Sequence, residues 1–119
     1  EPAERVFKTL MAEVDGKPIC AVIPVAQELS LKKLATACGG KSAKIMKPAD
    51  AERITGYKVG GISPFGGRRN VPTFLAQEAS DLPYILMNGG GRGLQVRLSV
   101  KDALAAMQGQ LADLVASHG

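Results

Sequence analysis

The sequence predicts a mixed α/β fold in which helices flank a curled, barrel-like mixed sheet. The chain has 119 residues, a usual size for one domain, so we expect a single domain over residues 1–119. Its segments read as strands, two short helices, more strands and a closing helix, without the strand–helix–strand repetition of a doubly wound sheet. Apolar residues make up 45% of the chain, with three Phe, two Tyr and no Trp, so the core should be aliphatic.

The first two strands should form a hairpin. Residues 6–14 are rich in β-prone side chains, and an apolar run follows at residues 19–25. Between them stands Asp15-Gly16, a dipeptide that is typical of tight hairpin turns.

Two short helices and a short strand should come next. Ser30 is a good N-cap for a helix over residues 31–38, and Gly39 is a typical C-terminal stop. Residues 44–47 could form a short strand. Pro48 suits the first turn of a second helix that ends before residue 56.

The second half of the chain predicts three strands and one long helix. Residues 71–75 and 84–87 read as strands, the latter buried on both faces. Residues 94–98 alternate apolar and polar side chains, as a half-exposed strand does. Ser99 begins a capping-box pattern, and residues 100–117 carry apolar residues at helical spacing.

The charge balance is compatible with an anionic partner but does not require one. Fifteen Lys and Arg against eleven Asp and Glu give a net charge of +4 and a pI near 9.3. This excess favours a polyanion such as RNA, although a solvated lysine-rich surface has the same composition.

The cysteine spacing and the lengths of the apolar runs indicate the cellular compartment of the protein. Cys20 and Cys38 have no zinc-site or disulfide-framework spacing and should be buried free thiols. No apolar run is long enough to cross a membrane, and no signal peptide precedes the fold, so we expect a cytoplasmic protein. The chain begins at Glu1 without an initiator Met, directly before a strand-like segment, so we expect an N-terminal piece to be missing.

Two glycine-rich segments are the strongest site signal. Residues 56–69 hold five glycines, and residues 89–93 hold four; both contain arginine. Glycine lets a ligand approach the main chain, so these segments suggest backbone donors aimed at an anion. Neither is a nucleotide motif: Gly67 and Arg68 replace the Lys and Ser/Thr of a phosphate loop, and Leu94 replaces the third glycine of a dinucleotide fingerprint. Residues 59–62 should be a strand edge or a shaped loop.

The usual catalytic clusters are missing from the sequence. The one histidine, His118, stands beside the C-terminus, and no set of metal ligands has suitable spacing, so we expect no metal and no cofactor. Lys8 shares a strand face with apolar Leu10, which fits either a lysine that snorkels at a sheet edge or a cation held at a pocket. Asn88 is either a turn former or a ligand contact.

Several segments together resemble the YbaK/EbsC family, the freestanding relatives of the editing domain of bacterial prolyl-tRNA synthetase. The resemblance runs in register over nearly the whole chain. Its segments are Phe7-Lys8-Thr9-Leu10, Pro24-Val25, Leu31-Lys32-Lys33, Thr55-Gly56-Tyr57, Val59-Gly60-Gly61-Ile62-Ser63-Pro64-Phe65-Gly66, Asn88-Gly89-Gly90 and Arg92-Gly93-Leu94.

The resemblance implies the YbaK fold and an aminoacyl-tRNA deacylase that removes cysteine from mischarged tRNA(Pro), with the substrate thiol attacking its own carbonyl. By motif, Lys8 matches the lysine that the family needs for activity, and Gly60 and Gly61 match glycines whose backbone contacts the aminoacyl end. Further residues implied to bind substrate are Thr9, Ile62, Ser63, Pro64, Asn88 and Gly89. The basic residues near the glycine-rich segments, Lys58, Arg68, Arg69 and Arg92, are candidates for RNA contact.

Two alternative functions are also compatible with the sequence. Family members often carry Ser where this chain has Asn88, which leaves a deacylase for Ala-tRNA(Pro) or another small amino acid as an alternative. A regulatory module that binds tRNA or a nucleotide without catalysis is a second. A transient complex with prolyl-tRNA synthetase is expected in either case. The resemblance also implies a few tens of residues before the first strand that help to wall the pocket, and we expect these to be the missing N-terminal piece.

Overall fold

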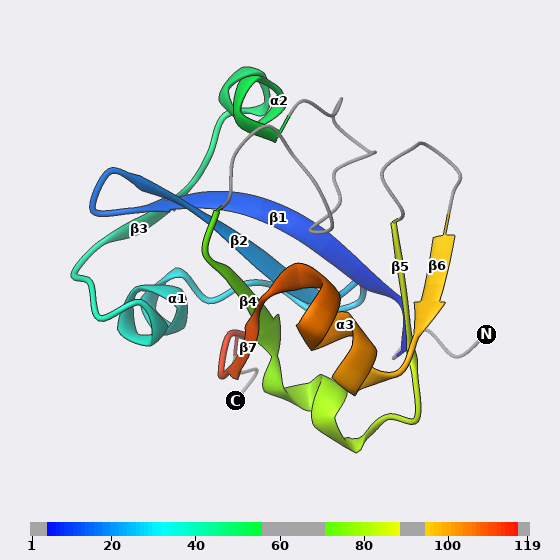
Figure 1. The fold of residues 1–119 in the computed structure, drawn as a ribbon. Coiled ribbons are helices and arrows are strands. Elements are labelled where there is room, and N and C mark those ends of the chain that lie inside the picture. The colour runs from blue at the N-terminus through cyan, green and yellow to red at the C-terminus, as the bar shows by residue number, and fades with distance from the viewer. Residues whose placement is uncertain (1–4, 56–70, 89–94, 117–119) are drawn as a thin grey trace.

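A five-stranded mixed sheet forms the centre of the molecule, with helices around it (Figure 1). The computed structural model describes residues 5–55, 71–88 and 95–116. In chain order the elements are β1 (Phe7–Val14), β2 (Lys17–Pro24), α1 (Leu31–Ala37), β3 (Ala43–Ile45), α2 (Pro48–Thr55), β4 (Thr73–Ala76), the 3-10 helix η2 (Gln77–Asp81), β5 (Ile85–Asn88), β6 (Gln95–Leu98), α3 (Val100–Met107) and β7 (Gln110–Ala112). The sheet order is β3-β1-β2-β4-β7, and β5 and β6 pair separately.

The first hairpin forms as the sequence predicts. Asp15 and Gly16 have φ of 51° and 84°, left-handed values that Gly and Asp tolerate well, and they join the Val14–Lys17 pair. The Asp15 carboxylate also accepts hydrogen bonds from the backbone N–H groups of Lys41 and Ser42. The hairpin turn therefore also fixes the chain that leads into β3.

Local capping explains the first helix. The Ser30 hydroxyl accepts a hydrogen bond from the Lys33 N–H at 3.2 Å, and Gly39 follows the helix end with φ of 70°. These features confirm the N-cap and the glycine stop. The second helix begins at Pro48, also as predicted.

The long closing helix predicted over residues 100–117 is wrong. Ser99 does cap a helix, through a 3.1 Å bond from the Asp102 N–H, but α3 ends at Met107. Gln108 adopts left-handed φ of 51°, and after Gly109 the chain enters β7, which pairs parallel with β4. The apolar residues beyond Gly109 fit helical spacing, yet they pack in a strand and the segment after it. The glycine was the sequence signal for this break.

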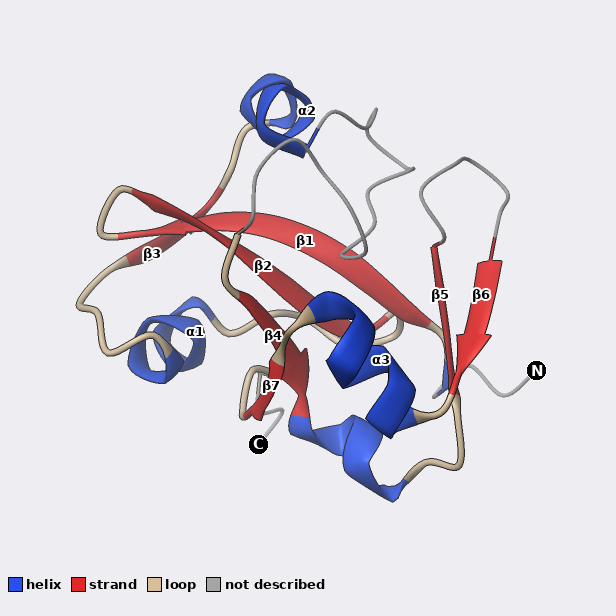
Figure 2. Ribbon diagram, viewed as in Figure 1, coloured by secondary structure: helices blue, strands red, loops and turns tan. Residues whose placement is uncertain are grey.

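The mixed α/β class is confirmed, whereas the barrel is only loosely present. Within the described residues the five-stranded sheet is open, and a single parallel bridge, Val6–Leu86, links its β1 end to the β5–β6 pair. Figure 2 shows β5 and β6 standing beside the end of β1, with helices at the periphery. The helix η2 was not expected from the sequence.

The core is mainly aliphatic, as the composition predicts, although Phe7 and Phe74 are buried in it as well. The chain between Ile19 and Ile23 is buried on both faces of β2, because β2 lies at the centre of the sheet. The largest fully buried side chains are Val22, Ile23, Leu34, Leu75, Ile85, Met87 and Leu114. Among the described helices, none is long and apolar enough to cross a membrane.

Candidate functional site

The structure describes two of the predicted site side chains, Lys8 and Thr9, together with the backbone of Asn88. The remaining predicted site residues lie outside the described part of the chain: Lys58, Gly60, Gly61, Ile62, Ser63, Pro64, Arg68, Arg69, Gly89 and Arg92. Their roles stay predictions.

Lys8 lies in β1, opposite the fully buried Ile23 of β2. Its side chain is half-buried, and it forms no ion pair or hydrogen bond within residues 5–55, 71–88 and 95–116. At this point β1 is not a free edge, since β2 flanks one side and β5 contacts the strand as well. A half-buried lysine without an ion pair among the described residues is compatible both with a side chain that snorkels to the surface and with a cation held for a ligand.

Lys8 and Asn88 occupy matched positions on neighbouring segments. The Val6–Leu86 bridge is parallel, and each of the two residues follows the bridge by two positions. Because side chains alternate along a strand, Lys8 and Val6 share a face of β1. Asn88 also pairs with Gln95 at the end of the β5–β6 ladder. The fold therefore brings the two motifs together although 80 positions separate them in the sequence.

Thr9 lies on the opposite face of β1 from Lys8, opposite Val22 of β2. Its hydroxyl oxygen is buried, yet it has no hydrogen-bond partner in the part of the chain that the structure describes. A buried hydroxyl left unpaired costs about 1–3 kcal/mol, so a ligand donor at this atom would be stabilising. One pocket over one face of β1 cannot use both side chains, and Thr9 stays a weaker candidate than Lys8.

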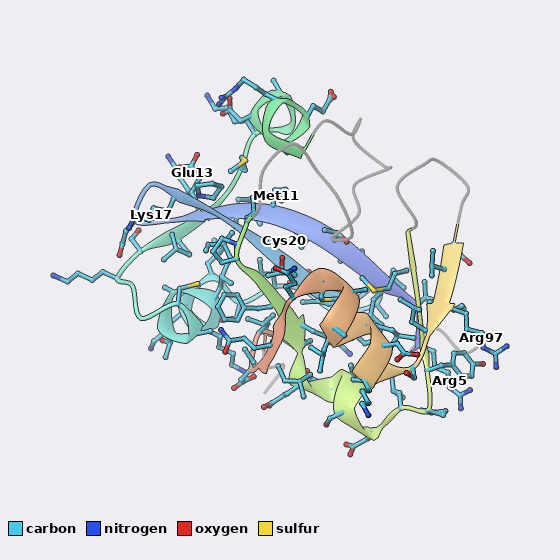
Figure 3. The ribbon with its side chains drawn as sticks, viewed as in Figure 1. Arg5, Met11, Glu13, Lys17, Cys20 and Arg97 are labelled. Atoms are coloured by element: carbon cyan, nitrogen blue, oxygen red, sulfur yellow. The ribbon has the colours of Figure 1, made fainter. Side chains whose placement is uncertain are left out.

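Cys20 is not poised as a nucleophile. It lies between Met11 and Thr73 in the sheet, and Figure 3 places it in the interior of the molecule. Burial raises the pKa of its thiol to about 12, against a smaller lowering by a hydrogen bond with Thr73. The thiolate is therefore scarce at neutral pH. Cys38 is also free but only half-buried, which corrects the expectation that both thiols are buried.

We expect the two thiols to differ sharply in reactivity. At pH 8 an aromatic disulfide reagent should react with Cys38 in the folded protein and with Cys20 only after unfolding, because thiolate fraction and access control the rate. Burial, followed by the nearby Asp15 charge, raises the pKa of Cys38, so its reaction should be slower than that of free cysteine. Cys38→Ser should abolish the native-state reaction and Cys20→Ser should leave it unchanged; the reverse pattern would contradict the burial assignment.

A separate hollow of about 660 Å³ lies between α1 and β7. Across it, the Lys33 ammonium donates to Asp113 Oδ1 at 3.1 Å and to the Val115 carbonyl at 2.8 Å, which ties the C-terminal segment to α1. Its lining is Ser30, Lys32, Lys33, Thr36, Ala37, Phe74, Gln110, Leu111, Ala112 and Asp113. Neither Lys8 nor Thr9 belongs to it.

The structure brings together three residues that no sequence motif marks: Arg5, Tyr84 and Arg97. The guanidinium carbon of Arg97 lies 3.8 Å from the ring centroid of Tyr84, and that of Arg5 lies 4.8 Å from the same centroid. Figure 3 shows both arginines at the β5–β6 end of the molecule. The available signal was the alternation of β6, which leaves Arg97 exposed.

On the Lys8 face of β1, the described residues thus offer a half-buried ammonium but no activated nucleophile. No group of three or more His, Cys, Asp or Glu side chains within them could hold a metal ion. Such a site suits the orientation of a substrate that is already activated, or the binding of an anion.

Comparison with known proteins agrees with this chemistry. Residues 1–106 match the aminoacyl-tRNA editing domain family. EbsC of Enterococcus faecalis, a proposed Cys-tRNA(Pro)/Cys-tRNA(Cys) deacylase, is 44% identical over 112 residues, which cover 92% of this chain and 68% of EbsC. A proline–tRNA ligase of Nitratidesulfovibrio vulgaris is 35% identical over 65 residues, 55% of this chain and 11% of the ligase.

The fold is similar to solved structures as well. The crystal structure of a proposed trans-editing enzyme for prolyl-tRNA synthetase superposes with a TM-score of 0.89 at 23% identity. The match covers 97% of this chain and 73% of the other. At that identity the likeness shows a shared fold.

Proposed function

The chain belongs to the aminoacyl-tRNA editing domain family, and we propose that it hydrolyses Cys-tRNA(Pro), acting in the cytoplasm as a trans-editing deacylase. The observation that supports this most strongly is the 44% identity to EbsC across 92% of the chain. The placement of Lys8 beside the end of β5, half-buried and without an ion pair among the described residues, fits a site built for an anionic substrate. Cysteine and proline are similar in size, so the synthetase discriminates weakly between them and a second site must remove the error.

The chemistry needs no protein nucleophile. The cysteinyl sulfur attacks the carbonyl carbon of its own ester, a C–S bond forms, and the C–O bond to the terminal ribose breaks. The thiol proton goes to the departing ribose oxygen, and water then opens the resulting cyclic thioester to free cysteine. An aminoacyl ester is already activated, so orientation and stabilisation of the carbonyl oxygen are the main tasks of the protein.

We assign these tasks by residue. Lys8 holds the terminal adenosine or its phosphate, and the N–H groups of Gly60 and Gly61 stabilise the developing charge on the carbonyl oxygen. The inert thiol of Cys20 agrees with a reaction in which the substrate provides the sulfur.

Two further assignments belong to the proposal. The substrate is mischarged tRNA(Pro), and prolyl-tRNA synthetase is a transient partner that hands over the charged tRNA. The similarity of this chain to a segment of a proline–tRNA ligase supports the second, because there a related domain lies within the synthetase itself. A non-catalytic tRNA-binding module is the competing function.

The amino-acid preference separates the two candidate deacylases. We expect kcat/KM for Cys-tRNA(Pro) to exceed that for Ala-tRNA(Pro) by at least about 10²-fold, because alanine has no thiol to form the thioester and a positioned intramolecular nucleophile contributes strongly. Steady-state deacylation of both charged tRNAs by the same preparation measures the ratio. Equal rates would favour a general small-amino-acid deacylase with water as the nucleophile, and the Asn88 position would then be the first to vary.

A further inference from the structure

The strongest unassigned feature is the cluster of Arg5, Tyr84 and Arg97. It joins three parts of the chain: the residue before Val6 of the bridge, the residue before β5, and the middle of β6. In the β5–β6 register, Arg97 lies opposite Leu86, which places Tyr84 at the diagonal position on the same face. Both guanidinium carbons lie within 5 Å of the Tyr84 ring centroid, at 4.8 Å and 3.8 Å.

Within residues 5–55, 71–88 and 95–116, no carboxylate compensates the charge of the two arginines. The Arg5 Nε is buried and has no hydrogen-bond acceptor within the same part of the chain. Two like charges at one ring repel each other, and a buried unsatisfied donor is unfavourable, so an added anion would stabilise the cluster.

The cluster lies close to the proposed catalytic residue. Arg5 precedes Lys8 by three positions, at most about 11 Å of chain. Arg97 is exposed and Tyr84 is half-buried, so the guanidinium of Arg97 is accessible to a ligand in solvent. Arginine on an aromatic ring offers both donors for phosphate and a plane on which a base can stack.

We propose that Arg5, Tyr84 and Arg97 form an RNA-contact surface that holds the single-stranded acceptor end of tRNA next to Lys8. The proposal rests on the proposed function, since it takes tRNA as the ligand. The arginines bind backbone phosphates of the nucleotides that precede the charged adenosine, and the outer face of Arg97 stacks on a base. Binding at this surface sets tRNA affinity, whereas Lys8 acts at the reacting end.

Binding of uncharged tRNA(Pro) transcript to the full chain tests the surface without any turnover. We expect Arg97→Gln and Arg5→Gln each to raise Kd by about tenfold at 0.1 M salt and to reduce the slope of log K against log salt by about 0.7, the value for one phosphate contact on a single strand. Arg97→Lys keeps the charge and should preserve the slope while losing part of the affinity. Lys17→Gln removes one charge at the opposite end of the molecule (Figure 3). This variant should change neither the Kd nor the slope of log K against log salt.

The outcomes distinguish the two proposals. Unchanged Kd and slope in Arg97→Gln would overturn the RNA-contact surface, as would an equal loss in Lys17→Gln, which would show a general charge effect. If Arg5→Gln unfolds below the assay temperature, the Kd and salt slope of Arg97→Gln, a change at an exposed residue, alone decide whether the surface binds RNA. A wild-type chain that deacylates Cys-tRNA(Pro) while the variants bind normally refutes the surface and leaves the function intact. A chain that binds through the arginines but never deacylates refutes the function alone.

Discussion

Replacing Lys8 with alanine should lower kcat/KM for Cys-tRNA(Pro) deacylation by about 10²–10³-fold, the effect expected when one preorganised charged donor is lost from a site of this kind. The structure gives the reason: Lys8 is half-buried between β2 and the β5 end, and no carboxylate of the described residues pairs with it. Single-turnover rates at saturating enzyme would separate the chemical step from tRNA binding.

A matched control keeps this result interpretable. Lys17→Ala removes the same charge from an exposed position at the hairpin end, and its rate should equal the wild-type rate. Lys8→Arg keeps a charge but changes its geometry, so it should recover part of the activity. Full activity in Lys8→Ala, with an unchanged melting temperature, would refute the assignment of Lys8 as the catalytic residue.

Leu75→Ala should give the largest loss of stability, about 3–5 kcal/mol in the free energy of unfolding. Leu75 is fully buried in β4, between Val22 of β2 and Leu111 of β7, so truncation leaves a cavity that neighbouring strands cannot close. A domain of this size is stable by only about 5–15 kcal/mol, so the variant should be partly unfolded at the temperatures of a tRNA assay. Urea unfolding followed by circular dichroism measures the change.

The cross-strand partner provides the control for that prediction. Leu111 is 40% exposed and lies directly opposite Leu75 in the parallel register, so Leu111→Ala should cost less than about 1 kcal/mol. Similar losses at both positions would contradict the assignment of β7 as a half-exposed edge strand and would favour the helical pattern expected from the sequence.

The sequence predicted the parts of the fold that local chemistry determines. Asp15-Gly16 requires a left-handed turn wherever it stands in a hairpin, and Ser30 and Ser99 satisfy N–H groups of the helix that directly follows each of them. The prediction of a long closing helix was wrong because the apolar spacing beyond Gly109 fits a helix as well as a strand. Only the pairing with β4, more than 30 residues earlier in the chain, decides between the two structures.

The residues of the candidate site, like the elements of the fold, could be predicted only where a local motif marks them. Lys8 and Asn88 were identified through motifs, yet nothing in the local sequence shows that each follows the same bridge by two positions, because that bridge joins segments 80 positions apart. The sequence does not mark Arg5 and Arg97 as site residues for the same reason. Each is an ordinary charged residue in the sequence, and only the fold places both beside Tyr84. Long-range pairing, which depends on the packing of the whole domain, creates these contacts.

Release of labelled cysteine from Cys-tRNA(Pro), measured in a single turnover with the chain in excess, tests the central claim most directly. The account predicts a first-order release at least about 10²-fold faster than spontaneous ester hydrolysis, with tRNA(Pro) and free cysteine as the products. Cys-tRNA(Pro) that is bound by the chain yet decays only at the spontaneous rate would contradict it and identify a tRNA-binding module without catalysis.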